Sequence, residues 1–106
     1  MMELEGRLAD AAAAVAADTR PKSFEAAARR FTQALQTIPD YPAAEMSNEG
    51  FARVNALAEQ VISEIEHRLE RNIRDADRRE ALTQAIYDIR AALEEAFRWR
   101  RHYLKT

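Results

Sequence analysis

Residues 49–74 read EGFARVNALAEQVISEIEHRLERNIR, and no other part of the chain has so clear a helical pattern. The apolar side chains recur at steps of three and four residues and fall within a little under half of a helical wheel. They are Phe51, Val54, Leu57, Ala58, Val61, Ile62, Ile65, Leu69 and Ile73. This pattern predicts a helix with one face in a core. Ser47 or Asn48 can cap its start, because both side chains accept hydrogen bonds from a first helical turn.

A second long amphipathic segment follows at residues 78–104. Its apolar seam alternates steps of four and three residues, which is the a/d spacing of helices that pack side by side. The seam consists of Leu82, Ile86, Ile89, Leu93, Ala96, Arg100 and Tyr103, and Phe97 and Leu104 widen it. Asp75 and Asp77 can cap a new start between the two segments, so we predict a helical hairpin. The alternative is one unbroken helix over residues 49–104, since neither Gly nor Pro occurs after Gly50.

The spacing of apolar residues in the N-terminal half predicts two shorter helices, at about residues 2–17 and 22–38. The first has a thin stripe of Leu4, Leu8, Ala11 and Val15, and the second a fuller one of Phe24, Ala27, Phe31, Ala34, Leu35 and Ile38. Pro21 separates them, and residues 39–42 end the second. The predicted fold is all-α: an antiparallel helical bundle, residues 1–106, in which two short N-terminal helices pack on a long C-terminal hairpin.

Composition agrees with one helical domain and excludes several classes of site. A chain of 106 residues with 32% charged residues, two Gly and three Pro suits a folded domain with one core. Cysteine is absent, which excludes a disulfide framework, a zinc ribbon and a thiol nucleophile. Acidic residues precede the alanine-rich run at 11–17, where a signal peptide would need positive charge. We therefore expect a cytoplasmic protein, and no apolar stretch approaches the ~20 residues of a membrane span.

Charges pair along the predicted helices. Glu25 and Arg29, Glu49 and Arg53, and Glu94 and Arg98 each place an acid four residues before an arginine, a spacing that stabilises a helix. The chain also runs from an acidic start to a basic end, because residues 1–18 hold four acids and residues 98–105 hold four cations without an acid.

We expect no enzyme, no catalytic residue, no metal and no cofactor. Glu64 and His67 have the E-x-x-H spacing of di-iron bundles, but such a centre needs a second copy of the motif. The sequence around His67 also resembles the site of helical phosphotransfer domains, in which a small residue follows the histidine. Glu70 and Arg71 occupy that place here. His67 lies opposite the apolar stripe and should face water, so phosphorelay through His67 is the weakest alternative.

The C-terminal run FRWRRHYLK, residues 97–105, is the strongest candidate for a binding surface. Trp, Tyr and Arg often dominate the binding energy of interfaces, and Arg100 stands in the middle of an apolar seam. The predicted partner-binding residues are Arg98, Trp99, Arg100, Arg101 and Tyr103. The alternative is that the aromatic residues complete the core while the arginines complement the negative end of the helix dipole.

The expected function is therefore a non-enzymatic helical protein–protein interaction module. It would act as an adaptor, a regulator or a stoichiometric inhibitor that occludes a partner's surface. Two helices of ~25 Å cannot cover a hairpin of ~40 Å, so an apolar strip should invite another protein or a second copy, and we expect a homodimer. The alternative is association with nucleic acid through the basic, aromatic C-terminus, which the net charge of −2 disfavours.

Overall fold

A computed structural model describes residues 2–17, 20–41, 47–71 and 74–104, with the side chains of residues 2 and 102–104 excepted. Four α-helices account for most of these residues: α1 Met2–Ala17, α2 Pro21–Gln36, α3 Asn48–Glu70 and α4 Ala76–Leu104. A short 3₁₀ helix, η1 Ile38–Asp40, continues the direction of α2. The fold class is all-α, and the prediction of two short helices on a long hairpin is confirmed.

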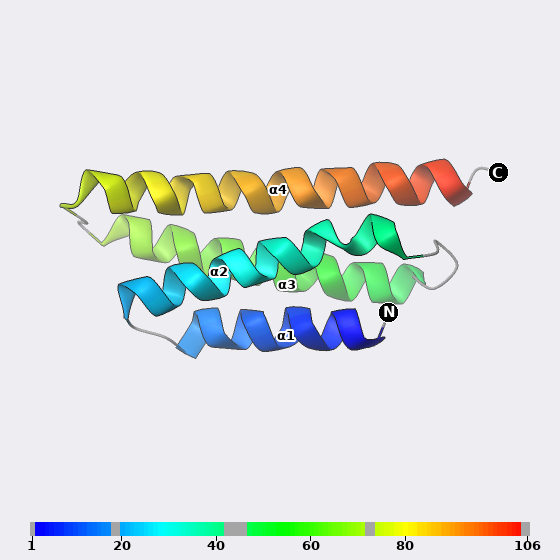
Figure 1. Cartoon of the computed structure of the whole chain (residues 1–106), viewed down its shortest axis with the longest axis horizontal. Coiled ribbons are helices and arrows are strands. Elements are labelled where there is room, and N and C mark those ends of the chain that lie inside the picture. Colours follow the sequence, from blue (N-terminus) through cyan, green and yellow to red (C-terminus); the bar gives the residue numbers. More distant parts are fainter. Residues whose placement is uncertain (1, 18–19, 42–46, 72–73, 105–106) are drawn as a thin grey trace.

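The helices form an antiparallel bundle in which each helix runs opposite to the one before it (Figure 1). α1 packs against α2 and α3, while α4 packs against the same two helices from the other side. The α1 and α4 helices are therefore diagonal to each other, and so are α2 and α3. The bundle measures 50 × 21 × 18 Å, and the start of α1 and the end of α4 lie at the same end of it.

One hydrophobic core runs between the helices, and every helix contributes to it. Fully buried large side chains include Leu4 and Leu8 of α1, Phe24 and Phe31 of α2, Ile62 and Ile65 of α3, and Leu82 and Ile89 of α4. The buried alanines of α1 and α2 have small side chains, so the backbones of these two helices can approach each other closely. Most positions that the three- and four-residue spacing predicts are buried, whereas Leu57, Leu69 and Ile86 are half-buried at the edge of the core. The predicted position Ile73 and the side chain of Leu104 lie outside the described residues.

The start of α3 is capped as the sequence suggests. The Oγ atom of Ser47 accepts a hydrogen bond from the backbone N–H of Gly50 at 3.0 Å. A Cβ atom at position 50 would lie 3.2 Å from this oxygen and 3.2 Å from Oε1 of Glu5. Glycine therefore leaves room for both the cap and the carboxylate of α1.

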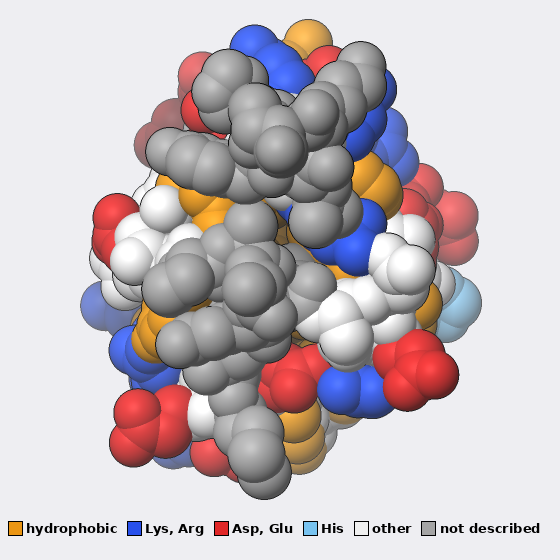
Figure 2. Space-filling model, turned by 90° about the vertical axis from the view of Figure 1, so that its right-hand side faces the viewer, with side chains coloured by type: hydrophobic (Ala, Val, Ile, Leu, Met, Phe, Trp, Pro, Cys, Tyr) orange, Lys and Arg blue, Asp and Glu red, His pale blue; other side chains and the backbone are white. Residues whose placement is uncertain are grey.

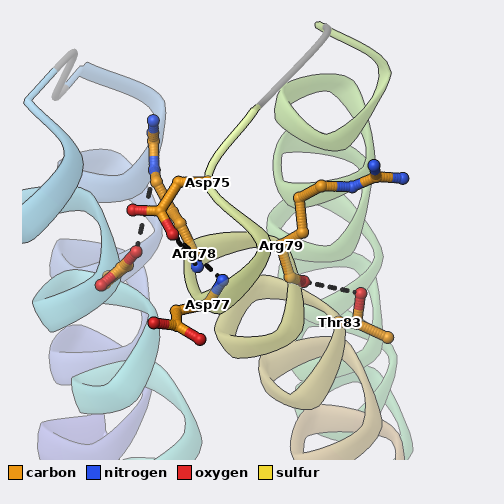
Figure 3. A network of polar contacts seen from close by, with 6 residues as sticks. Asp75, Asp77, Arg78, Arg79 and Thr83 are labelled. Carbon is orange, nitrogen blue, oxygen red and sulfur yellow. Dashed lines mark hydrogen bonds and ion pairs between the residues drawn. The ribbon is translucent and has the colours of Figure 1, made fainter.

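The two long helices are separate. α3 ends at Glu70 and α4 begins at Ala76, so residues 49–104 form a hairpin and not one unbroken helix. The cap of α4 is Asp75, whose Oδ1 accepts hydrogen bonds from the backbone N–H of Asp77 at 3.0 Å and of Arg78 at 3.3 Å (Figure 3). The side chain of Arg78 reaches across to α2, where its Nε lies 3.8 Å from Oε1 of Glu25.

Three charged side chains that the sequence pairs four residues apart on one helix take other partners. Arg53 pairs with Glu5 of α1 at 3.0 Å, and Arg98 pairs with Glu95 at 3.8 Å. Glu25 pairs with Arg78 of α4. Arg53 and Glu25 pair with residues of an adjacent helix, which is equally close in a bundle, whereas Arg98 pairs within α4 at a spacing of three residues.

Candidate protein-binding surface

Arg100, a predicted partner-binding residue, is engaged within the chain. Its side chain is half-buried, and Nη2 donates a hydrogen bond to Oδ1 of Asn48 at the start of α3. The guanidinium also lies over the ring of Phe51, 5.4 Å from the ring centroid. Arg100 therefore connects the last turns of α4 with the first turn of α3 through these two contacts.

The other four predicted residues are distributed around α4. Trp99 is half-buried and packs against the core, whereas Arg98 and Arg101 are exposed. Tyr103 belongs to α4, but its side chain lies outside the described residues. Consecutive helical residues point about 100° apart, so a contiguous run cannot present all its side chains to one partner. Only part of the predicted set can share a surface.

Two large hydrophobic side chains are exposed in the described part of the chain, and both are on α4. Tyr87 is 73% exposed and Phe97 is 39% exposed. The ring of Phe97 packs edge-to-face with that of Phe51, with ring centroids 4.4 Å apart and the rings inclined by 65°. Ten residues of helix separate Tyr87 and Phe97 by about 15 Å along the axis and about 80° around it, so both point to the same side.

The side chains between and beside these aromatics form what we call the outer strip of α4. It consists of Thr83, Tyr87, Arg90, Glu94, Phe97 and Arg101, all exposed. Each of them lies one residue after a member of the seam from Leu82 to Arg100 that faces the bundle. The strip therefore lies about 100° around α4 from the seam, and Phe97 is a member of it that also contacts α3, through Phe51.

Sequence analysis missed Tyr87, Arg90 and Glu94 as members of this surface. The signal was present, because the outer strip repeats the four- and three-residue steps of the core seam. The core seam is richer in aliphatic residues, so it dominates the helical wheel. Arg90 and Glu94 make neither a hydrogen bond nor an ion pair with any described residue, and both charges remain available.

The basic end of the chain does not become a separate basic surface. The acidic first turn of α1 and the arginines in the last turns of α4 lie at the same end of the bundle, where the ion pair of Glu5 with Arg53 also lies. Figure 2 shows acidic and basic side chains next to each other around the rim of this end. The charge asymmetry along the sequence is therefore largely balanced in space.

His67 is exposed, as its place on the wheel predicts. Its side chain is 69% exposed, and Nδ1 lies 3.9 Å from Oε2 of Glu70. Within the described ranges, no three His, Asp or Glu residues gather in a way that could hold a metal ion.

Two open grooves of about 380 and 350 Å³ flank α2, with Gln33 common to both. Arg7, Asp10 and Arg30 contribute charged groups to the larger groove, and Arg29 and Asp88 to the smaller. Among the described helices, none is long and apolar enough to cross a membrane. Comparison of the chain with protein-family models, with curated proteins and with solved structures found no match.

Proposed function

We propose that this chain is a non-enzymatic helical interaction module that binds a protein through the outer strip of α4. The proposal rests on one observation: Tyr87 and Phe97, the two large hydrophobic side chains that are exposed among the described residues, lie on the same side of the same helix. Aromatic and arginine side chains are the residues that most often anchor interfaces. The outer strip combines two aromatics with Arg90 and Arg101.

This surface modifies the binding site that the sequence predicts. Arg101 stays in it, and Phe97 and Tyr87 replace Trp99 and Arg100, which support the fold. Association with nucleic acid receives less support, because Arg100 is engaged with Asn48 and acidic side chains share the end of the bundle with the last arginines of α4. A module of this kind acts by occupying a partner's surface, as an adaptor, a regulator or a stoichiometric inhibitor does.

The test is the substitution Tyr87→Ala. Because this side chain is 73% exposed, its removal should leave the fold intact and weaken partner binding by roughly tenfold or more. The partner is first recovered on the immobilised chain from the native host and identified by mass spectrometry, and the affinity is then titrated with purified proteins. Gln33→Ala, an exposed substitution on α2, is the control. Equal affinity of the Tyr87→Ala variant and the control would contradict the proposal.

A further inference from the structure

We infer that the protein bound by the outer strip of α4 is a second copy of this chain, with the two α4 helices antiparallel about a two-fold axis. This inference rests on the proposed function and specifies its partner. The observation that carries it is the order of the side chains along the strip.

The positions of the strip are symmetric about position 92, with an aromatic residue at each matching outer position and opposite charges at the two inner ones. Tyr87 and Phe97 lie five positions on either side of position 92, and Arg90 and Glu94 lie two positions on either side of it. The steps from Tyr87 through Arg90 and Glu94 to Phe97 are three, four and three residues, an order that reversal leaves unchanged. A strip with this symmetry is self-complementary, as an isologous two-fold interface requires.

Antiparallel pairing at position 92 brings unlike charges together. Arg90 of each copy then lies at the height of Glu94 of the other, and Tyr87 at the height of Phe97. Farther out, the hydroxyl of Thr83 meets Arg101, so no two like charges of the strip are opposed. Parallel pairing in register would instead place each arginine and each glutamate opposite its own copy, which is unfavourable.

The described chain leaves these groups available for such a contact. Arg90 and Glu94 have no ion-pair partner among the described residues. Arg98, four residues after Glu94, pairs with Glu95 instead. Tyr87 and Phe97 are the exposed large hydrophobics of the described chain. The strip from Thr83 to Arg101 extends about 27 Å, and one pair of helices gives an interface at the small end of the usual range. The dimer should therefore dissociate on dilution.

Charge reversal tests the pairing. Arg90→Glu places two carboxylates opposite each other at both contacts, and Glu94→Arg places two guanidinium groups there. Each single variant should weaken dimerisation by roughly a hundredfold, because like charges meet twice. An equimolar mixture of the two variants should dimerise again, since every contact then joins a carboxylate to a guanidinium. The double variant Arg90→Glu/Glu94→Arg should form a homodimer by itself.

Sedimentation velocity over a concentration series measures these outcomes, with circular dichroism as the check on folding. Arg29→Glu on α2 and Glu3→Arg on α1 change the net charge equally at exposed sites away from the strip, and both should dimerise like the unmodified chain. The inference is overturned if the unmodified chain stays monomeric, if the single variants dimerise normally, or if their mixture remains monomeric. If the unmodified chain is monomeric and the Tyr87→Ala variant no longer binds some other protein, this inference is wrong and the proposed function stands.

Discussion

The guanidinium of Arg100 joins two helices at the edge of the core. It donates a hydrogen bond to Asn48, lies over the ring of Phe51, and has an Nε atom that is buried without a hydrogen-bond partner. The long apolar stem allows an arginine to follow a hydrophobic seam while its charged head reaches the surface. A charged residue can therefore occupy a core seam without a binding partner outside the chain.

Arg100→Ala should lower the free energy of unfolding by about 1–2 kcal/mol, through loss of the hydrogen bond and of the contact with Phe51. Urea denaturation measures the change. The matched control is Arg101→Ala, whose side chain is exposed and should change stability by less than about 0.5 kcal/mol. Equal effects of the two substitutions would mean that Arg100 has no structural role.

At the scale of the element, the α3–α4 boundary depends on one cap. The chain has no Gly or Pro between Glu70 and Ala76, and the residues on both sides favour helix. Asp75 accepts hydrogen bonds from two backbone N–H groups of the first turn of α4. These bonds satisfy donors that have no partner within the helix and fix the residue at which α4 begins.

Asp75→Ala should destabilise the chain by about 1 kcal/mol, because two backbone donors lose their acceptor. Asp75→Asn keeps a side-chain oxygen at the cap and should cost clearly less. Thermal unfolding followed by circular dichroism distinguishes the two variants. If both lowered the melting temperature equally, the charge of Asp75 rather than its capping bonds would explain the effect.

At the scale of the whole molecule, one core joins helices that lie diagonally across the bundle. Leu8 of α1 is fully buried, and Trp99 of α4, the single tryptophan, packs against the same core cluster. α1 and α4 are diagonal, so any coupling between them passes through the shared interior. Small domains with one core usually unfold in a single cooperative transition.

Leu8→Ala should therefore lower the free energy of unfolding by about 2–4 kcal/mol, as expected for a buried leucine. Its urea transition should also shift equally in Trp99 fluorescence and in far-UV circular dichroism, although Trp99 lies on the diagonal helix. Ala9→Ser, at an exposed neighbour, serves as the control. Separate transitions for the two signals would show that α1 unfolds independently of α4.

Sequence predicted the parts of this fold that depend on local chemistry. Leu82, Ile89 and the other members of the seam on α4 are buried as their spacing requires, because a helix fixes which side chains share a face. The cap at Ser47 and the break near Asp75 likewise follow from side chains that bond to their own backbone. These features need no knowledge of the neighbouring helices.

The candidate site depended on distances between helices, which spacing within one helix does not contain. Arg100 and Trp99 could belong to an interface or to a core until the start of α3 and the rest of the bundle were placed beside them. Tyr87 became notable only when the large hydrophobic side chains of the described residues, apart from Tyr87 and Phe97, proved not to be exposed. The sequence by itself determined the helices and their buried faces, and the tertiary structure alone decided which of the remaining side chains stay exposed, because exposure depends on what packs beside each helix.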